Sequence, residues 1–316
     1  LNTQLGALAV FLLSIGIFLV MAHQIQRPAQ LEWLVWTFLS LGALHIVVRL
    51  FPAIAGVVPD LFAPGATGSL FWAWLVALSS AQAIFNHRLP PIARLALLGL
   101  AVATLAVGWF QGRGWVSGWL PPLVALLAII WLRSRRLGLL VTAGGLVYLV
   151  WQDPGLIGSL FGLKDYSIFT RDVARQILLT DVFPLSPILG LGPANYYWYT
   201  SLFPILGYYV QFNSHNNYVD ILLQTGLLGF ACFAWFVFAI GRLGWQLRHR
   251  VAVGFEQAYV YGALAGLCGT LVAAWLGDWF LPFVYNIGFE GLRSSMFGWM
   301  FLGGLAGVEH IVVAPL

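Results

Sequence analysis

Long apolar segments recur along the whole chain, separated by short polar stretches. Each segment approaches the roughly 20 residues that an α-helix needs to cross the hydrocarbon core of a bilayer. Because backbone polar groups cannot remain unpaired in hydrocarbon, such a chain is expected to form transmembrane helices. The pattern predicts an all-α, polytopic transmembrane helix bundle of about nine spans, at residues 5–22, 33–50, 69–86, 93–110, 117–132, 137–151, 217–241, 257–276 and 294–310.

The regular pattern stops between residues 152 and 216, where no segment is long and apolar enough to span. Connections of this length in compact proteins usually carry function. We therefore divide the chain into N-terminal transmembrane helices (1–151), a region of one large, partly helical loop and three spans (152–308), and a short tail (309–316). The chain begins inside an apolar run without a basic flank, which predicts further helices upstream and no cleavable signal peptide.

Composition supports a membrane protein, since only 8% of the residues are charged, against about a quarter in soluble domains. The net charge is +4, but the basic residues sit in separate short loops and not on one face. This distribution argues against nucleic acid as a partner. Cys232 and Cys268 fall inside predicted spans, where cysteine acts as a small apolar residue.

The basic residues concentrate in alternate loops. The residues concerned are Arg27, Arg88, Arg94, Arg133, Arg135, Arg136, Arg242, Arg248 and Arg250. By the positive-inside rule these loops face the cytoplasm, so the 152–216 loop faces the other side. No pool of ATP or nucleotide sugar exists there, and the sequence contains no glycine-rich phosphate loop. An enzyme on that side would need an activated substrate such as a lipid diphosphate.

The outer loop contains two arginines on one predicted helical face. Residues 164–179 have helical spacing, and Arg171 and Arg175 are four positions apart. Two guanidinium groups on one face suit an oxyanion with several equivalent oxygens, and a diphosphate fits best. In the alternative interpretation, the arginines pair with Asp172 and with lipid headgroups.

A histidine follows the loop where the seventh predicted span begins. Ser214 or Asn216 can cap this helix, and the helix start disfavours protonation of the neighbouring His215 ring. A neutral histidine near pH 7 can act as a general base; the alternative is an interfacial histidine without a role. Asp220 and Gln224 extend a polar face along the helix. Asp220 could orient His215 or a substrate hydroxyl, or it could pair with a loop arginine and be structural. Asn216 and Asp220 are further candidates for substrate binding.

Other polar side chains are weaker candidates. Arg293, before the last span, and Arg49, near the outer end of the second span, can join the anion site or extend to the interface. The aromatic runs 196–199 and 208–209 are typical of an interfacial belt, although some rings could stack on sugars. No histidine and carboxylate spacing indicates a metal site, so no metal or cofactor is expected.

Three elements resemble the O-antigen ligase/polymerase superfamily of bacterial envelope glycosyltransferases. The first is Arg171, a helix and then PILGLG at Pro187–Gly192, and the second is SHNNYVDILLQTGLLG at Ser214–Gly229. The third is the closing helix with GWMFLGG at Gly298–Gly304. The resemblance covers roughly residues 150–308, and the histidine-to-glycine string is its most specific part.

This resemblance implies transfer of a glycan from undecaprenyl diphosphate to a hydroxyl of a glycan or glycolipid acceptor, with inversion and without a metal. The reaction would take place on the extracytoplasmic face of the bacterial inner membrane. By position, Arg171 would bind the diphosphate and His215 would act at the acceptor, with Arg175 and Arg293 as weaker matches. Many relatives have glutamate where this chain has Gln224. The motifs do not separate ligase from polymerase; the other functions considered are a lipid-linked glycan flippase and a membrane scaffold.

Overall fold

The computed structural model describes residues 2–54, 63–152 and 166–313, and eleven α-helices lie in these ranges. They are α1 (Asn2–Gln24), α2 (Pro28–Leu50), α3 (Ser69–Phe85), α4 (Pro91–Gly112), α5 (Val116–Arg133), α6 (Arg135–Gln152), α8 (Tyr166–Ile177), α9 (Tyr196–Tyr199), α10 (Asn217–Leu247), α11 (Phe255–Leu276) and α12 (Gly288–Val313). Short helical turns follow α2, α8 and α9, at Pro52–Ile54, Leu178–Leu185 and Thr200–Leu202. The described ranges contain no β-strand.

Seven of these helices are long and apolar enough to cross a bilayer, namely α1, α2, α4, α5, α10, α11 and α12. The protein is therefore a multi-pass helical membrane protein, and the all-α prediction is confirmed. The other two predicted spans, 69–86 and 137–151, also form helices. Neither of these helices is both long enough and apolar enough to be a candidate membrane span.

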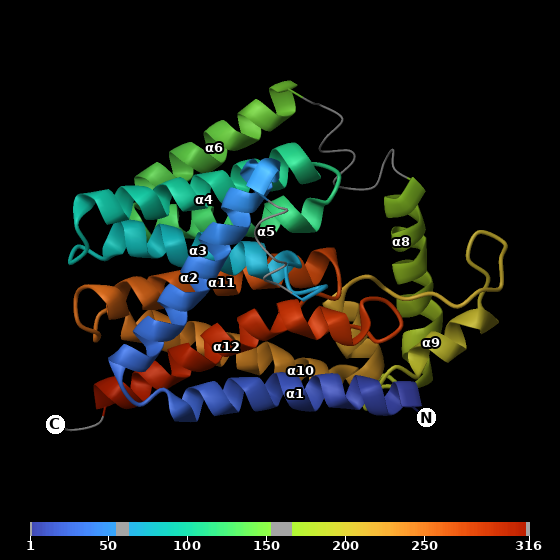
Figure 1. Cartoon of the computed structure of the whole chain (residues 1–316). Helices are drawn as coiled ribbons and strands as arrows, with labels where there is room; N and C mark the ends of the chain where they lie inside the picture. The colour runs from blue at the N-terminus through green and yellow to red at the C-terminus, as the bar shows by residue number, and fades with distance from the viewer. Residues whose placement is uncertain (1, 55–62, 153–165, 314–316) are drawn as a thin grey trace.

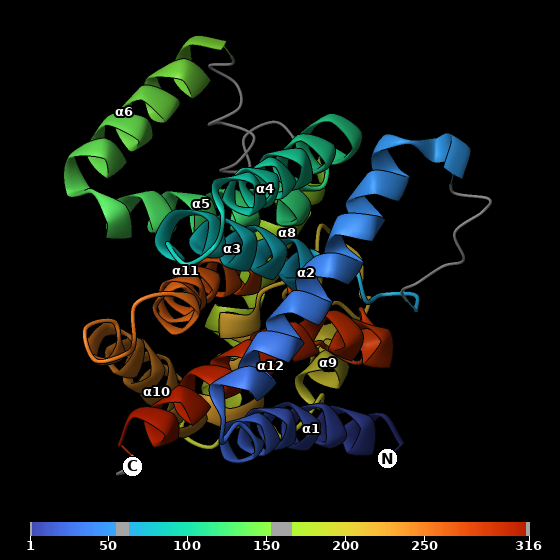
Figure 2. The same cartoon turned by 60° about the vertical axis from the view of Figure 1, so that its left-hand side comes forward.

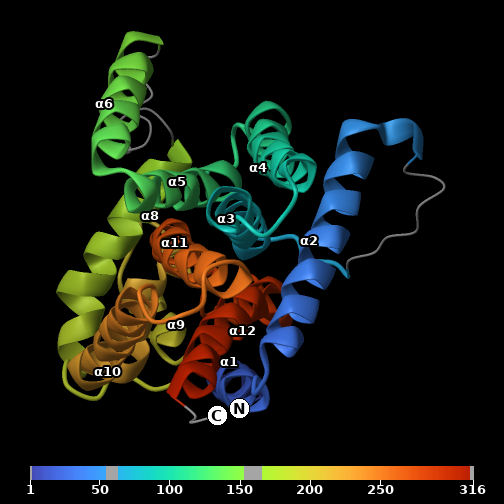
Figure 3. The same ribbon diagram turned by 90° about the vertical axis from the view of Figure 1, so that its left-hand side faces the viewer.

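The predicted span at 69–86 forms α3, which has 17 residues and is almost wholly buried. The Ser69 hydroxyl at its start donates to the Ser117 carbonyl at 2.5 Å. At its end the Asn86 side chain turns back to Gln82, at 2.8 Å. Figure 3 shows α3 among α4, α5 and α11. A helix surrounded in this way needs an apolar surface on every side, so its composition indicates packing as much as contact with lipid.

The predicted span at 137–151 lies within α6, whose side chains are nearly all exposed. This helix begins with Arg135 and Arg136 and ends with Gln152, which lowers its hydropathy. Figure 2 shows that it projects away from the bundle beside α5. The helix extends over the predicted segment, but with its polar ends it is not apolar enough to be a candidate membrane span.

The connections between helices alternate between the two ends of the bundle. The α1–α2, α3–α4, α5–α6 and α10–α11 connections lie at one end of the bundle (left in Figure 1), and the concentrated arginines lie in these connections or in the adjoining helix ends. Helices α8 and α9 lie at the opposite end, beside the starts of α1 and α10. The residues of the 152–216 loop that the structure describes thus lie at the end opposite the basic loops.

Helix α10 is broken at Gly226, which has φ 66° and ψ −169°. Four backbone hydrogen bonds that join α10 to residues 187–192 replace the helical ladder at the break. Leu191 and Gly192 donate to the carbonyls of Leu223 and Gln224 at 2.8 and 3.0 Å; Leu227 and Leu228 donate to the carbonyls of Pro187 and Ile188 at 2.8 and 3.2 Å. In an unbroken helix the N–H groups of Leu227 and Leu228 would instead donate to the carbonyls of Leu223 and Gln224. Residues 187–192 are therefore inserted into the helix ladder.

Two glycines make this insertion possible. A Cβ atom on Gly226 would lie 2.2 Å from the Ile188 carbonyl oxygen, and one on Gly190 would lie 2.4 Å from the Gln224 carbonyl carbon. Both residues also have positive φ, where residues other than glycine are strained. The Gln224 side chain adds a further bond, because its oxygen accepts from the Ala194 N–H at 2.9 Å. Two of the three elements that carry the family resemblance thus interlock in space.

Candidate functional site

His215 lies directly before α10 in a strained backbone conformation. Its φ is 47°, in the left-handed region that residues other than glycine rarely adopt. The next residue, Asn216, is the N-cap of α10: its side-chain oxygen accepts from the N–H groups of Tyr218 and Val219. The cap and the chain before it hold His215 in place, and strain of this kind often marks a functional position.

A carboxylate and an amide lie behind the His215 ring. Asn286 Nδ2 is 3.2 Å from His215 Nδ1, and the same nitrogen donates to Asp278 Oδ1 at 2.7 Å. The second oxygen of Asp278 accepts from the Phe283 N–H at 2.9 Å. Asn217, at the start of α10, bonds to the backbone of Phe280 and Leu281. The loop between α11 and α12 is thereby fixed to the start of α10.

The histidine ring is kept neutral by its surroundings. The pKa of His215 is lowered from its ordinary value, first by burial and then by the positive charges of Arg171 and Arg175. The sequence analysis also expected a neutral ring, but attributed it to the helix start. The pKa of Asp278 is raised because the carboxyl is buried, while its N–H donors and the charge of Arg171 act in the opposite direction. Arg171 therefore acts electrostatically on both His215 and Asp278.

The two arginines of α8 differ in their partners. Arg175 forms an ion pair with Asp172 at 2.7 Å and donates to the Arg171 carbonyl at 3.2 Å. Within the described ranges, no hydrogen bond or ion pair engages the Arg171 guanidinium. Pairing with Asp172, one part of the alternative interpretation, thus applies to Arg175, and within the described ranges it does not apply to Arg171.

Asp220 does not contact His215; it lies in a buried network behind it. One carboxylate oxygen accepts from the Tyr196 hydroxyl and lies 2.7 Å from the Ser214 hydroxyl. The other oxygen is buried without a hydrogen-bond partner in the described part of the chain. The pKa of Tyr196 is raised well above its ordinary value, first by burial and then by the charge of Asp220. This network joins α9 to α10 behind the strained turn.

Removing the Tyr196 hydroxyl should destabilise this end of the protein. The Tyr196→Phe variant would leave Asp220 with one donor fewer in a buried position, which costs about 1–3 kcal/mol. We expect a lower midpoint of thermal unfolding in detergent, with proteolysis starting near residues 187–202. The exposed Tyr208 provides the matched control, because Tyr208→Phe removes a hydroxyl that the structure does not bury. Equal stability of the two variants would contradict a structural role for the Tyr196 bond.

The remaining predicted site residues lie elsewhere or have internal partners. Asn216 is buried, and both ends of its amide are used, by the α10 backbone and by the Trp275 carbonyl at 3.0 Å. Arg49 is exposed and donates to the Gln111 side chain at 3.0 Å. Arg293 is exposed and donates to the Pro64 carbonyl at 2.8 Å. Neither Arg49 nor Arg293 is among the charges that shift the pKa of His215.

The aromatic run divides into buried and exposed rings. Tyr196 is buried and stacks on Phe283, with the ring centroids 5.0 Å apart, and Tyr197 stacks on Tyr285 at 4.1 Å. The exposed rings are Trp198, Tyr199, Tyr208 and Tyr209. Only these exposed rings remain available for an interface or for a sugar.

The connection between Asp278 and Asn286 was not predicted from the sequence. The available signal was weak: a single acidic residue follows an apolar helix, and an asparagine follows eight positions later. The described residues contain no group of three histidine, cysteine or acidic side chains arranged to hold a metal ion. The chemistry that this arrangement offers is hydrogen bonding and positive charge.

The strained turn gives a prediction that separates backbone from side-chain effects. His215→Gly should be more stable than His215→Ala by roughly 1–2 kcal/mol, because an L-residue is penalised in the left-handed region. Both variants lose the imidazole, so the comparison isolates the backbone; unfolding in detergent would measure it. Leu140, an exposed position within α6, provides the control. There the glycine variant should be less stable than the alanine variant by about 1 kcal/mol. Equal unfolding free energies for His215→Ala and His215→Gly would argue against backbone strain at this position.

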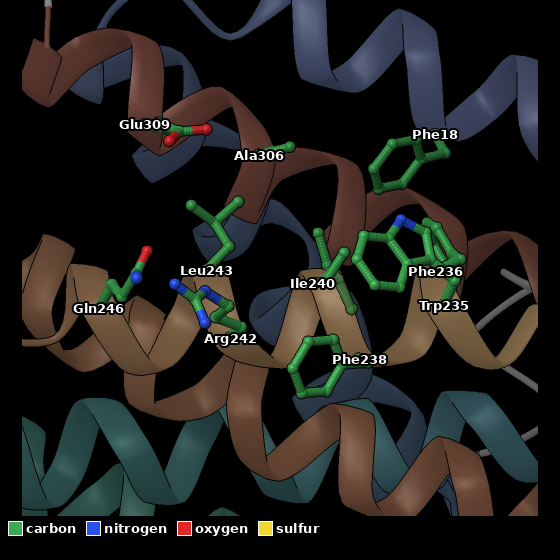
Figure 4. A pocket seen from close by; sticks show the side chains of 11 residues that line it. Phe18, Trp235, Phe236, Phe238, Ile240, Arg242, Leu243, Gln246, Ala306 and Glu309 are labelled. Carbon is green, nitrogen blue, oxygen red and sulfur yellow. The ribbon is translucent and has the colours of Figure 1, made fainter.

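Several hollows lie among the helices, and α10 contributes to the walls of two of them. An apolar cavity of about 410 Å³ lies beside α10, with Phe11, Ile221, Thr225, Leu281 and Trp299 in its walls. A second hollow between α1, α10 and α12 has aromatic walls, and Arg242 and Glu309 lie at one end of it (Figure 4). The apolar cavity shares α10 and the α11–α12 loop with His215; the second hollow includes none of the predicted site residues.

In comparisons with known proteins, no family model, no curated protein and no solved structure matches this chain. The description that the sequence and the fold together support is that of a multi-pass helical membrane protein.

Proposed function

We propose that this protein transfers a glycan from undecaprenyl diphosphate to a sugar hydroxyl at the extracytoplasmic face of a bacterial inner membrane. The observation that carries the proposal is that α8, whose Arg171 acts electrostatically on His215, lies at the end of the bundle opposite the basic connections, beside the start of α10. The resemblance of residues 171–229 to O-antigen ligases and polymerases supports the same reaction. The acceptor is a glycan or a glycolipid.

Arg171 suits the anionic part of such a donor. Its guanidinium has no hydrogen bond or ion pair within the described ranges, and an arginine fork matches phosphate oxygens in pairs. Arg175, although paired with Asp172, adds positive charge nearby. A diphosphate is the leaving group of this reaction, so charge that develops on it would be stabilised by about 3–4 kcal/mol per well-placed donor.

The apolar cavity beside α10 suits the lipid part. Its walls include Leu281, whose backbone bonds to Asn217 at the start of α10, together with Ile221, Thr225 and Trp299. A prenyl chain is apolar along its whole length and would gain free energy from leaving water. A diphosphate near Arg171 and a prenyl chain in this cavity would occupy neighbouring parts of the protein.

The reaction exchanges one carbon–oxygen bond for another. The bond between the anomeric carbon and the diphosphate oxygen breaks, and its electron pair leaves with the diphosphate. The acceptor oxygen forms a bond to the same carbon from the opposite face and loses its proton. No nucleotide and no redox step is needed, in agreement with a site outside the cytoplasm.

A lipid-linked glycan flippase is the alternative. One observation favours it, because broken helices such as α10 are typical of secondary transporters. In those proteins, however, the break exposes backbone groups to a substrate site, whereas residues 187–192 bond to the freed groups of α10. This arrangement favours the transferase.

Reconstitution with a defined donor tests the proposal. Proteoliposomes would receive an undecaprenyl-diphosphate-linked oligosaccharide, with a lipid A core sugar or a second lipid-linked repeat as acceptor, with and without EDTA. We expect the glycan to move to one acceptor at a rate that EDTA leaves unchanged. A donor that crosses the bilayer intact would support the flippase instead, and a strict requirement for Mg²⁺ or Mn²⁺ would contradict the proposed mechanism.

A further inference from the structure

We infer that Asn286 and Asp278 hold His215 as the neutral tautomer with its hydrogen on Nε2, so that His215 is a hydrogen-bond donor to the substrate. The inference concerns the site of the proposed transferase, and its role in the reaction rests on that function. It differs from the general-base role that the sequence alone suggests.

The Asn286 amide lies between His215 and Asp278. Its nitrogen has two hydrogens and no lone pair to accept with. One hydrogen points to Asp278 Oδ1 at 2.7 Å, and the nitrogen lies 3.2 Å from His215 Nδ1. The second hydrogen can therefore only be donated to Nδ1, which must have a free lone pair. In a neutral imidazole the remaining hydrogen is then on Nε2.

Asp278 determines which way the amide faces. Its Oδ2 accepts from the Phe283 N–H at 2.9 Å, and a carboxylate can only accept hydrogen bonds. The amide oxygen of Asn286 would be repelled by Asp278 Oδ1, so the amide nitrogen takes that position. Asp278 thus orients Asn286, and Asn286 orients the ring. Both are positioning residues, as partners of this kind commonly set the tautomer of a histidine.

The remaining nitrogen of the ring is the one left for the substrate. The described residues give His215 Nε2 no hydrogen bond, and the ring is half-buried. A donor at Nε2 supplements the guanidinium of Arg171, since both groups stabilise negative charge on a diphosphate oxygen. The acceptor hydroxyl would release its proton to water after its bond to the anomeric carbon has formed, when it is strongly acidic.

Nitrogen NMR of the full chain with labelled histidine tests this inference in detergent or nanodiscs. His215→Gln identifies the signals of His215 among the six histidines. We expect Nδ1 to resonate as an unprotonated nitrogen and Nε2 as a protonated one. The exchanged pair Asp278→Asn with Asn286→Asp keeps the charge and should place a carboxylate against Nδ1, which would move the hydrogen to Nδ1.

A wild-type ring protonated on Nδ1, or a tautomer that the exchanged pair does not change, would overturn the inference. If the exchanged pair does not fold, Asn286→Leu provides a second measurement. It removes the donor, so the signals of both nitrogens should shift toward an average of the two tautomers; unchanged signals would again overturn the inference. Because the readout is spectroscopic, a protein with no transferase activity would contradict the proposed function and leave the tautomer assignment standing.

Discussion

Substituting alanine for Gly226 should strongly destabilise the protein. The new Cβ atom would meet the Ile188 carbonyl oxygen at 2.2 Å, so residues 187–192 could not remain in the α10 ladder. Alanine in the left-handed region adds about 1–2 kcal/mol, and each of the four backbone bonds contributes about 0.5–1.5 kcal/mol. We expect a loss on the order of 4 kcal/mol in unfolding free energy, measured in detergent.

Gly99, on the exposed side of α4, provides the matched control. A Cβ atom there would have no neighbour within 4 Å, and alanine is the better helix former. Gly99→Ala should therefore be neutral or slightly stabilising. Limited proteolysis should cut Gly226→Ala between residues 187 and 195 and leave Gly99→Ala intact. A Gly226→Ala protein as stable as the wild type would show that the loop is not inserted as described.

Replacing His215 by alanine should reduce the turnover of a lipid-diphosphate donor by at least ~100-fold. This is the lower limit for the loss of a positioned proton-transfer group, and the loss of one preorganised hydrogen-bond donor has a similar effect. The ring is the group that Asn286 and Asp278 orient, and burial together with the charges of Arg171 and Arg175 lowers its pKa. The measurement is initial-rate turnover in proteoliposomes at matched protein content.

His87, an exposed histidine at the other end of the bundle, is the control for general effects of removing an imidazole. His87→Ala should retain full turnover. His215→Gln separates the two roles of the ring, since glutamine can donate a hydrogen bond but cannot accept a proton at neutral pH. We expect it to retain more activity than His215→Ala. Full activity in His215→Ala would exclude the residue from the reaction.

Most of the helices could be predicted from the sequence because each of them is a long apolar segment, and such a segment is a local property of the chain. The spacing of Arg171 and Arg175 predicted α8, and the polar string before residue 217 predicted the start of α10. Composition could not distinguish lipid from protein as the surroundings of α3, because both select apolar side chains.

The break in α10 could not be predicted, because its cause lies more than 30 residues earlier in the chain. A threonine and a glycine after Gln224 are compatible with a continuous apolar helix, and only the approach of residues 187–192 makes the break stable. The connection from Asp278 through Asn286 to His215 could not be predicted for the same reason, because it depends on a contact between two loops that are distant in the sequence. Arg49 and Arg293 were placed in the site by proximity to its end of the membrane, but the rotation of their helices directs them to other partners.

The most direct test of the account is the rate of glycan transfer in Arg171→Lys beside Arg113→Lys, both in proteoliposomes with the lipid-diphosphate donor and its acceptor. Lysine keeps the charge of arginine but loses the paired donors that match a diphosphate. Arg113 is an exposed arginine at the end of α4 that lies over the Trp109 ring and not beside His215. The account predicts that Arg171→Lys lowers turnover by about 100-fold or more, while Arg113→Lys transfers at the wild-type rate. Equal rates in the two variants and the wild type would contradict the claim that Arg171 binds the departing diphosphate.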